Sequence, residues 1–264
     1  IRDSSTSRGL GDVYKRQLQE AEGDFDKAVD IIRKKGLIVA SKRADREAKE
    51  GCVLAVVEGK KGVLVSLNCE TDFVAKNENF INFTKQILKT ALENMPADLN
   101  SLLALKLDGR SIADQIAEQT GIIGEKLELS FYGKLEAEDA IAYIHPGNKL
   151  ATIVGFNKPA DMQVKKDVAM QVAAMDPISI DKNDVPESVI AHELEIGKEK
   201  AREEGKPENM LEKIAQGRLN KFFQESTLMN QAFIKEAKQT VKAYIQSNDK
   251  DLTVTGFVRY TLND

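Results

Sequence analysis

The sequence contains few of the residues that bind metals or act as nucleophiles. Its 264 residues include two cysteines, two histidines and no tryptophan. Cys52 and Cys69 cannot make a structural zinc site without histidines nearby, and a disulfide framework is unusual in a cytosolic protein. We therefore expect both cysteines to be buried thiols, and we expect no metal site and no cofactor.

Recognised catalytic motifs are also missing. The sequence has no GxxxxGK phosphate loop, HExxH zinc helix, GxSxG elbow or CxxC pair. His192 and Glu193 begin an HE pair, but Ile196 stands where the second histidine of a zinc helix would be. We expect His192 in a helix and His145 in a hairpin turn, with no nucleophile beside either. The sequence thus predicts no catalytic residues and no enzymatic activity. The remaining enzymatic alternative is a hydrolase that uses one of the two cysteines.

Long apolar runs and a large excess of one charge are absent as well. The longest apolar runs, such as residues 52–57, fall far short of the roughly 20 residues that span a bilayer, and no charged and then apolar leader opens the chain. Lysine and arginine total 38 against 42 aspartate and glutamate, a net charge of −4, so there is no overall attraction to polyanions. We expect a cytoplasmic protein with no membrane partner and no nucleic-acid partner.

The first 17 residues differ from the rest of the chain. They show neither a helical nor a strand period, they are biased toward Ser, Arg and Gly, and they do not begin with Met. Residues 12–17, DVYKRQ, are similar to translated cloning or sequencing-adapter sequence. We interpret residues 1–17 as a non-native segment, with a natural disordered tail as the alternative.

A short helix and a charged linker are predicted for residues 18–50. Asp24 is a suitable N-cap, Ile31 and Ile32 lie on one helical stripe, and Gly36 is placed to end the helix. Residues 33–46 then carry six basic residues and one acid. We interpret this stretch as a solvated linker. The alternative is contact with RNA, which would make the chain an RNA- or ribosome-associated binding protein.

The period changes to that of strands at residue 51. Residues 52–57 and 63–68 predict a hairpin with a five-residue loop at residues 58–62. A helix with an apolar stripe follows the hairpin. We then expect a second helix at residues 111–119, capped by Ser111, and an extended segment at residues 127–135. The stripe consists of Phe80, Phe83, Ile87 and Ala91.

The same order recurs in the second half of the chain. Residues 140–145 and 150–156 predict another hairpin, a striped helix follows it, and residues 252–262 close the half. The stripe consists of Val164, Val168, Val172 and Met175. Antiparallel strands with packed helices indicate an α+β fold of two repeated core subdomains, at residues 51–137 and 138–264.

The second half also carries an insertion at about residues 187–224. Residues 188–204 are helical in composition, and Gly205 and Pro207 mark a stop and a restart. A second helix follows, with a stripe of Leu211, Ala215, Leu219 and Phe222. We expect two antiparallel helices that form either a projecting coiled-coil-like hairpin or a cap on the core.

Residues 70–77 read ETDFVAKN and lie between the first predicted hairpin and its helix. This octapeptide resembles the signature of the elongation factor Ts family. Four other segments resemble that family in the same order along the chain: GDFDKAVDIIRKKG at 23–36, KKDVAMQVAAMDP at 165–177, EGKPENMLEKIAQGRLNKFF at 204–223 and VTGFVRY at 254–260. The resemblance covers the chain from about residue 18 to its end. It departs from the family at the front, where the family's small helical (UBA-like) module is truncated.

The resemblance implies a function and a set of contact residues. Elongation factor Ts proteins bind elongation factor Tu with GDP and promote GDP release, and they bind no nucleotide themselves. By resemblance, Thr71, Asp72, Phe73 and Val74 bind the partner and dislocate its Mg²⁺, with Phe73 as a wedge, and His145 is a further candidate contact. The alternative for this segment is structural, with Phe73 and Val74 in the helix core and Thr71 or Asp72 as the helix cap.

Overall fold

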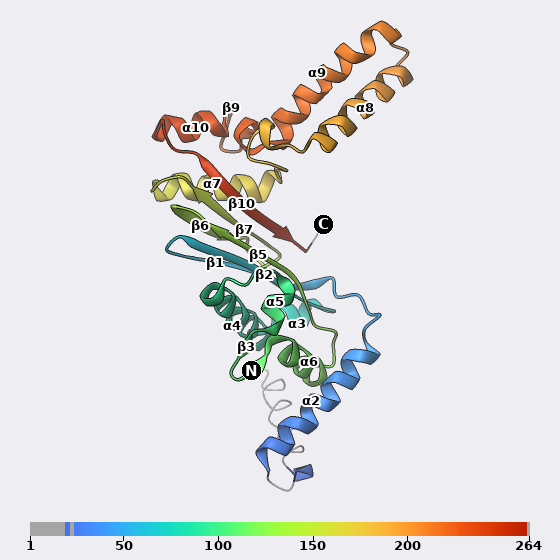
Figure 1. The fold of residues 1–264 in the computed structure, drawn as a ribbon, viewed down its shortest axis with the longest axis vertical. Helices are drawn as coiled ribbons and strands as arrows, with labels where there is room; N and C mark the ends of the chain where they lie inside the picture. The colour runs from blue at the N-terminus through green and yellow to red at the C-terminus, as the bar shows by residue number, and fades with distance from the viewer. Residues whose placement is uncertain (1–18, 22–23, 263–264) are drawn as a thin grey trace, which may run out of the picture.

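The computed structural model describes residues 19–21 and 24–262 and has two three-stranded antiparallel sheets stacked face to face, with helices on their outer faces (Figure 1). The predicted α+β fold is confirmed. The interpretation of residues 1–17 falls outside the described residues and stays a prediction. The division of the chain into domains also stays a prediction.

The first sheet has the order β1-β2-β5, with β1 at Glu50–Glu58, β2 at Lys61–Cys69 and β5 at Glu128–Glu136. The predicted hairpin is present, but the predicted five-residue loop is wrong, because pairing continues to the rung formed by Glu58 and Lys61. Only Gly59 and Lys60 form the turn. Gly59 has φ +60°, the left-handed conformation that a two-residue hairpin turn requires.

Helices cover the outer face of this sheet. They are α3 at Asp72–Ala75, α4 at Glu78–Asn94, α5 at Leu99–Ala104 and α6 at Ile112–Ile123, and a small ladder of β3 at Lys106–Leu107 and β4 at Arg110–Ser111 lies between the last two. The stripe predicted on α4 is buried against the sheet, and Ser111 caps α6 as predicted, since its hydroxyl accepts a hydrogen bond from Asp114 N.

The second sheet has the order β10-β7-β6, with β6 at Asp139–Ile144, β7 at Leu150–Phe156 and β10 at Val254–Thr261. Its outer face is covered by α7 at Met162–Met175, α10 at Val241–Asn248 and the ladder of β8 at Ala232–Phe233 with β9 at Glu236–Thr240. The predicted stripe on α7 is buried except for Met175, which is 44% exposed. Met175 ends the helix and Asp176 turns into the left-handed region, so this side chain lies beyond the core.

A separate apolar layer joins the two sheets. Val53 and Leu64 on the first sheet pack with Ala151 and Ile153 on the second, and all four side chains are buried. The rings of Phe131 on β5 and Tyr260 on β10 stack with centroids 4.4 Å apart. Because β1, β2 and β7 are covered on both faces, their sequences are almost continuously apolar rather than alternating.

The insertion forms a projecting hairpin and not a cap on the core (Figure 1). α8 at Glu187–Glu203 and α9 at Glu208–Ser226 run side by side away from the sheets. Short 3-10 turns, η1 at Lys182–Asp184 and η2 at Leu228–Asn230, flank the hairpin at its base. The stripe predicted on α9 is buried except for Phe222, which is half-buried.

Helix α2 spans Phe25–Lys42, so the predicted helix end at Gly36 is wrong. The predicted cap is confirmed, since the Asp24 side chain accepts a hydrogen bond from Lys27 N at 3.2 Å. Gly36 instead lies where α2 crosses α6: a Cβ there would be 2.6 Å from the carbonyl oxygen of Ala117, and one on Gly121 would be 2.5 Å from Gly36 Cα. Both glycines permit close helix packing. A UBA-like module is not confirmed.

We expect Gly36→Ala to loosen α2 from α6, because the new methyl group meets backbone that cannot rotate away. Gly217→Ala in α9 is the matched control, since its Cβ meets nothing within 4 Å. In an open helical position this change stabilises by about 0.5–1 kcal/mol. Hydrogen exchange should be faster in α2 for Gly36→Ala alone. Unchanged α2 protection together with a raised melting temperature would contradict the close packing.

Candidate functional site

The octapeptide of residues 70–77 contains α3, a single helical turn between β2 and α4. Thr71 is its N-cap, and the Thr71 hydroxyl accepts a hydrogen bond from Val74 N at 3.4 Å. Val74 is half-buried against the first core and Ala75 is buried. Phe73 is 84% exposed, so the alternative that placed it in the helix core is wrong. The structural alternative is confirmed for Thr71, which caps the helix, and for Val74, which packs against the core.

Among the large apolar side chains whose exposure the structure describes, that of Phe73 is the most exposed. Phenylalanine is among the residue types most often buried, so a ring with this exposure is uncommon. Charged neighbours flank this ring on α3. Lys76 Nζ lies 2.6 Å from Asp72 Oδ2, and this hydrogen bond lowers the pKa of Asp72 and raises the pKa of Lys76. The arrangement exposes an aromatic group beside a charged pair at the surface.

Two carboxylates, those of Glu125 and Glu70, join the chain that precedes α3 to the segment that follows α6. Glu125 Oε2 accepts hydrogen bonds from Thr71 N at 3.0 Å and from Glu70 N at 3.2 Å, and Glu125 Oε1 accepts one from the Thr71 hydroxyl at 2.6 Å. In the opposite direction, Glu70 Oε1 accepts hydrogen bonds from Lys126 N at 2.6 Å and from Arg43 Nη1 at 2.8 Å. These donors, the Lys126 N–H foremost, lower the pKa of Glu70.

Sequence reasoning missed the role of Glu125, which lies 54 residues beyond Thr71. The local signal is the preceding Gly124, which ends α6 in the left-handed conformation at φ +79°. A glycine at that point indicates where the helix stops. Glu125 follows this glycine. The packing of α6 against the sheet determines which strand end the Glu125 side chain reaches.

The turn between β6 and β7 reaches the same end of the sheets as α3. His145 is exposed there, and its Nδ1 lies 2.9 Å from the Tyr143 hydroxyl. Lys149 Nζ lies 2.9 Å from Glu50 Oε2 and hydrogen-bonds Oε1 at 3.2 Å. Glu50 pairs with Cys69, directly before the octapeptide, and the charge of Lys149 adds to the lowering of the Asp72 pKa by Lys76. The structure therefore brings the predicted site residues of the two hairpins toward the same end of the stacked sheets.

The cysteines have the environment of buried thiols, as predicted. Both side chains are buried, and desolvation raises the pKa of Cys52 to about 11 and the pKa of Cys69 to about 12. The Cys69 thiol donates a hydrogen bond to the carbonyl oxygen of Thr71 at 3.2 Å. A nucleophilic cysteine needs an accessible thiol with a lowered pKa, and neither side chain provides one.

Metal and membrane sites receive no support from the described part of the chain. Among the side chains that the structure describes, no group of three or more His, Cys, Asp or Glu is arranged to hold a metal ion. The described residues include no helix with the length and apolar character needed to cross a bilayer. His192, as predicted, lies in a helix, where it is exposed on α8.

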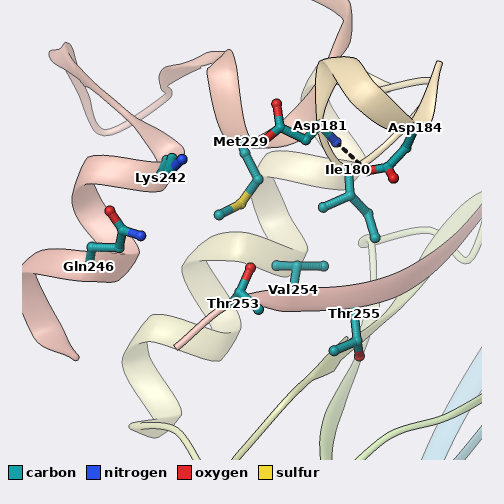
Figure 2. A pocket seen from close by; sticks show the side chains of 9 residues that line it. All are labelled: Ile180, Asp181, Asp184, Met229, Lys242, Gln246, Thr253, Val254 and Thr255. Atoms are coloured by element: carbon teal, nitrogen blue, oxygen red, sulfur yellow. Dashed lines mark hydrogen bonds between the residues drawn. The ribbon is translucent and has the colours of Figure 1, made fainter. Parts of the chain in front are cut away.

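A cavity of about 460 Å³ lies beside α10, far from α3 along the stacked layers (Figures 1 and 2). Lys242 comes from α10, and Asp181 and Asp184 lie on the other side of the opening (Figure 2). The two acids already serve the 3-10 turn η1, where Asp184 accepts from Asp181 N at 3.0 Å and Asp181 accepts from Asn230 Nδ2 at 2.7 Å. Both acids at this cavity therefore take part in the structure of the turn.

We expect both thiols of the native protein to label slowly with a maleimide between pH 7 and pH 9. The thiolate is the reactive form, and both pKa values lie well above this range. Labelling in urea, where both side chains are exposed, is the control. Rapid labelling of either cysteine in the native protein would restore the hydrolase alternative.

We expect Glu70 to make stability depend on acidity. The folded pKa lies below the ordinary value of 4.5, so the stabilisation is complete above that value and is lost as the pH falls through the folded pKa. Glu70→Gln should flatten the fall in unfolding free energy between pH 6 and pH 3, measured by urea titration. Glu93→Gln removes an exposed carboxylate that lies 3.8 Å from Lys89 Nζ and should leave the fall unchanged. If the unfolding free energy of Glu70→Gln fell with pH as much as that of the parent, the assignment of this pH dependence to Glu70 would be wrong.

Comparison with known proteins identifies the family. The family model described as Elongation factor TS matches residues 70–264. A protein named Elongation factor Ts from Porphyromonas gingivalis is 51% identical over 250 residues, which cover 94% of this chain and 91% of that protein. The proteins of the same name from Azobacteroides pseudotrichonymphae and Christiangramia forsetii are 50% and 47% identical, and each alignment covers 98% of this chain and 94% of the relative. With a fold, an octapeptide and relatives that agree, the chain belongs to the elongation factor Ts family and is a factor of translation elongation in protein biosynthesis.

Proposed function

We propose that this chain is a guanine-nucleotide exchange factor that binds elongation factor Tu with GDP and promotes GDP release. The observation that carries the proposal is Phe73, an aromatic side chain 84% exposed on a turn whose cap and flanking backbone are hydrogen-bonded. The chain acts in the cytoplasm as a binding protein and not as an enzyme. It needs no cofactor and binds no nucleotide itself.

Exchange requires only that the factor prefer the nucleotide-free partner to the loaded one. By linkage, a factor that weakens GDP binding about 10⁴-fold is itself bound more weakly by the same ratio when GDP is present, a coupling of about 5.5 kcal/mol. Burial of one phenylalanine side chain contributes about 1.5–3 kcal/mol. The remainder must come from other contacts and from disturbance of the Mg²⁺ that holds the phosphates in the partner.

The site residues divide by their surroundings. Phe73 and Asp72 contact the partner directly. Phe73 is the wedge, and Asp72 is its charged neighbour, whose pKa is lowered by the hydrogen bond from Lys76. Thr71 and Val74 belong to the same contact segment and fix its base, through the helix cap and the core. His145, exposed on the β6–β7 turn, is a second contact.

The chain is proposed to have the division that its sequence predicts. A truncated helical module and linker would occupy residues 18–50, and the core subdomains residues 51–137 and 138–264, with the helical hairpin at about 187–224 inserted in the second. Support comes from the separate apolar clusters on the outer faces of the two sheets.

The RNA-binding alternative finds less support. Of the six basic residues at 33–46, three form ion pairs: Arg33 with Asp114 at 2.9 Å, Lys35 with Glu20 at 2.8 Å, and Arg43 with Glu70 at 2.8 Å. Cations paired in this way contribute less to phosphate binding, because counterion release depends on free positive charge at the phosphates.

Phe73→Ala should slow the release of fluorescent GDP from elongation factor Tu at fixed Mg²⁺. Loss of about 1.5–3 kcal/mol predicts a fall of about ten- to hundredfold in the stimulated rate. Met162→Ala is the matched control, because it removes another exposed apolar side chain, 54% exposed on α7. Equal effects of the two changes would exclude the wedge. A parent chain that failed to accelerate release would contradict the exchange function itself.

A further inference from the structure

The backbone that leads into α3 has just left the sheet. Cys69 is the last residue of β2 and pairs with Glu50, so the next two N–H groups, those of Glu70 and Thr71, have no strand partner. Unpaired backbone donors in a partly buried position are costly. Glu125 supplies the missing acceptor, since its Oε2 receives both N–H groups at 3.2 and 3.0 Å. The Glu125 carboxylate thus supplies the acceptors that a neighbouring strand would otherwise provide, at the point where the chain passes from β2 to α3.

The same carboxylate orients the helix cap. A threonine hydroxyl has one hydrogen and two lone pairs. The Thr71 hydroxyl gives its hydrogen to Glu125 Oε1 at 2.6 Å, which leaves a lone pair for Val74 N at 3.4 Å. An apolar group at residue 125 would leave this hydrogen without its acceptor. Glu125 therefore acts on the cap through its hydrogen bonds to Thr71.

Hydrogen bonds run in both directions between residues 70–71 and 125–126, and they extend to the C-terminal end of α2. Glu70 accepts hydrogen bonds from Lys126 N and Arg43 Nη1, and Lys126 Nζ donates to the carbonyl oxygen of Ala44 at 3.0 Å. Residues 125 and 126 lie shortly before β5, which pairs with β2 beginning at the pair of Asn68 with Glu128. The strand end before α3 is thus fixed to a sheet strand on one side and to the C-terminal end of α2 on the other.

A four-residue helix has little stability of its own, because helix nucleation is unfavourable. The Phe73 ring is too exposed to orient α3 by core packing. We propose that Glu125 is a positioning residue for exchange, which holds the cap of α3 so that Phe73 projects toward the partner. This inference rests on the proposed role of Phe73 in exchange. It adds a residue outside the octapeptide, 54 positions further along the chain from Thr71.

The first test is amide hydrogen exchange of the full chain, which needs no partner. Glu125→Ala should speed exchange at the Thr71 amide at least about tenfold, because the carboxylate acceptor is lost. Glu125→Gln should retain much of the protection, since its amide oxygen can accept the two N–H groups and its NH₂ can donate to Thr71 Oγ1. Glu93→Ala, at an exposed glutamate of α4, is the control. Unchanged Thr71 protection in Glu125→Ala would overturn the proposal whatever the exchange assay gives.

The second test is GDP release from elongation factor Tu at saturating concentrations of each variant. We expect Glu125→Ala to lower the maximal rate about tenfold, with Glu125→Gln closer to the parent. In a Phe73→Ala background, Glu125→Ala should add no further loss, because it acts through Phe73. The same loss in both backgrounds would mean a general folding defect and would overturn the positioning role. If Phe73→Ala itself had no effect, the wedge would fail, and hydrogen exchange would still decide whether Glu125 holds the cap.

Discussion

The packing of one three-stranded sheet on the other is the constraint on which the rest of the structure depends. Val53, Leu64 and Ile153 fill the layer between the sheets, while each outer face has its own cluster beneath helices. A one-residue slip in the pairing of a strand would move its side chains to the opposite face of the sheet, and the two faces of each sheet pack in different apolar clusters. The ends of β2 and of the β6–β7 turn are therefore held in fixed relation, and both carry site residues.

The site lies where a strand leaves that rigid frame. The backbone donors of Glu70 and Thr71 no longer belong to the ladder, and a carboxylate from after α6 binds them instead. Phe73 is left exposed, which is unfavourable for an isolated chain but suits a group that is to be buried in a partner. A contact segment that is already ordered loses less conformational entropy on binding. The hydrogen bonds around Thr71 thus connect the stability of the fold with the proposed exchange function.

Much of the fold could be predicted because the signals were local and periodic. The stripe containing Phe80 and Ile87 was enough to predict α4, and the Ser111 cap to predict the start of α6. Predictions failed where a local signal had two uses. Gly36 matches a helix end, but it serves a close crossing of α2 on α6. Residues 58–62 contain loop-forming glycines, but the ladder continues through Glu58 and Lys61.

The sequence by itself determined the fold class, most element positions and, through ETDFVAKN, the family that the comparisons identify. These depend on spacing along the chain and on agreement with a known octapeptide. Only the tertiary structure decided that Phe73 is exposed while Val74 packs on the core, and that Glu125 binds the backbone before α3. The physical reason is that exposure and long-range hydrogen bonds depend on which surfaces the packed helices and sheets bring together, and adjacent positions of one helical turn point in different directions.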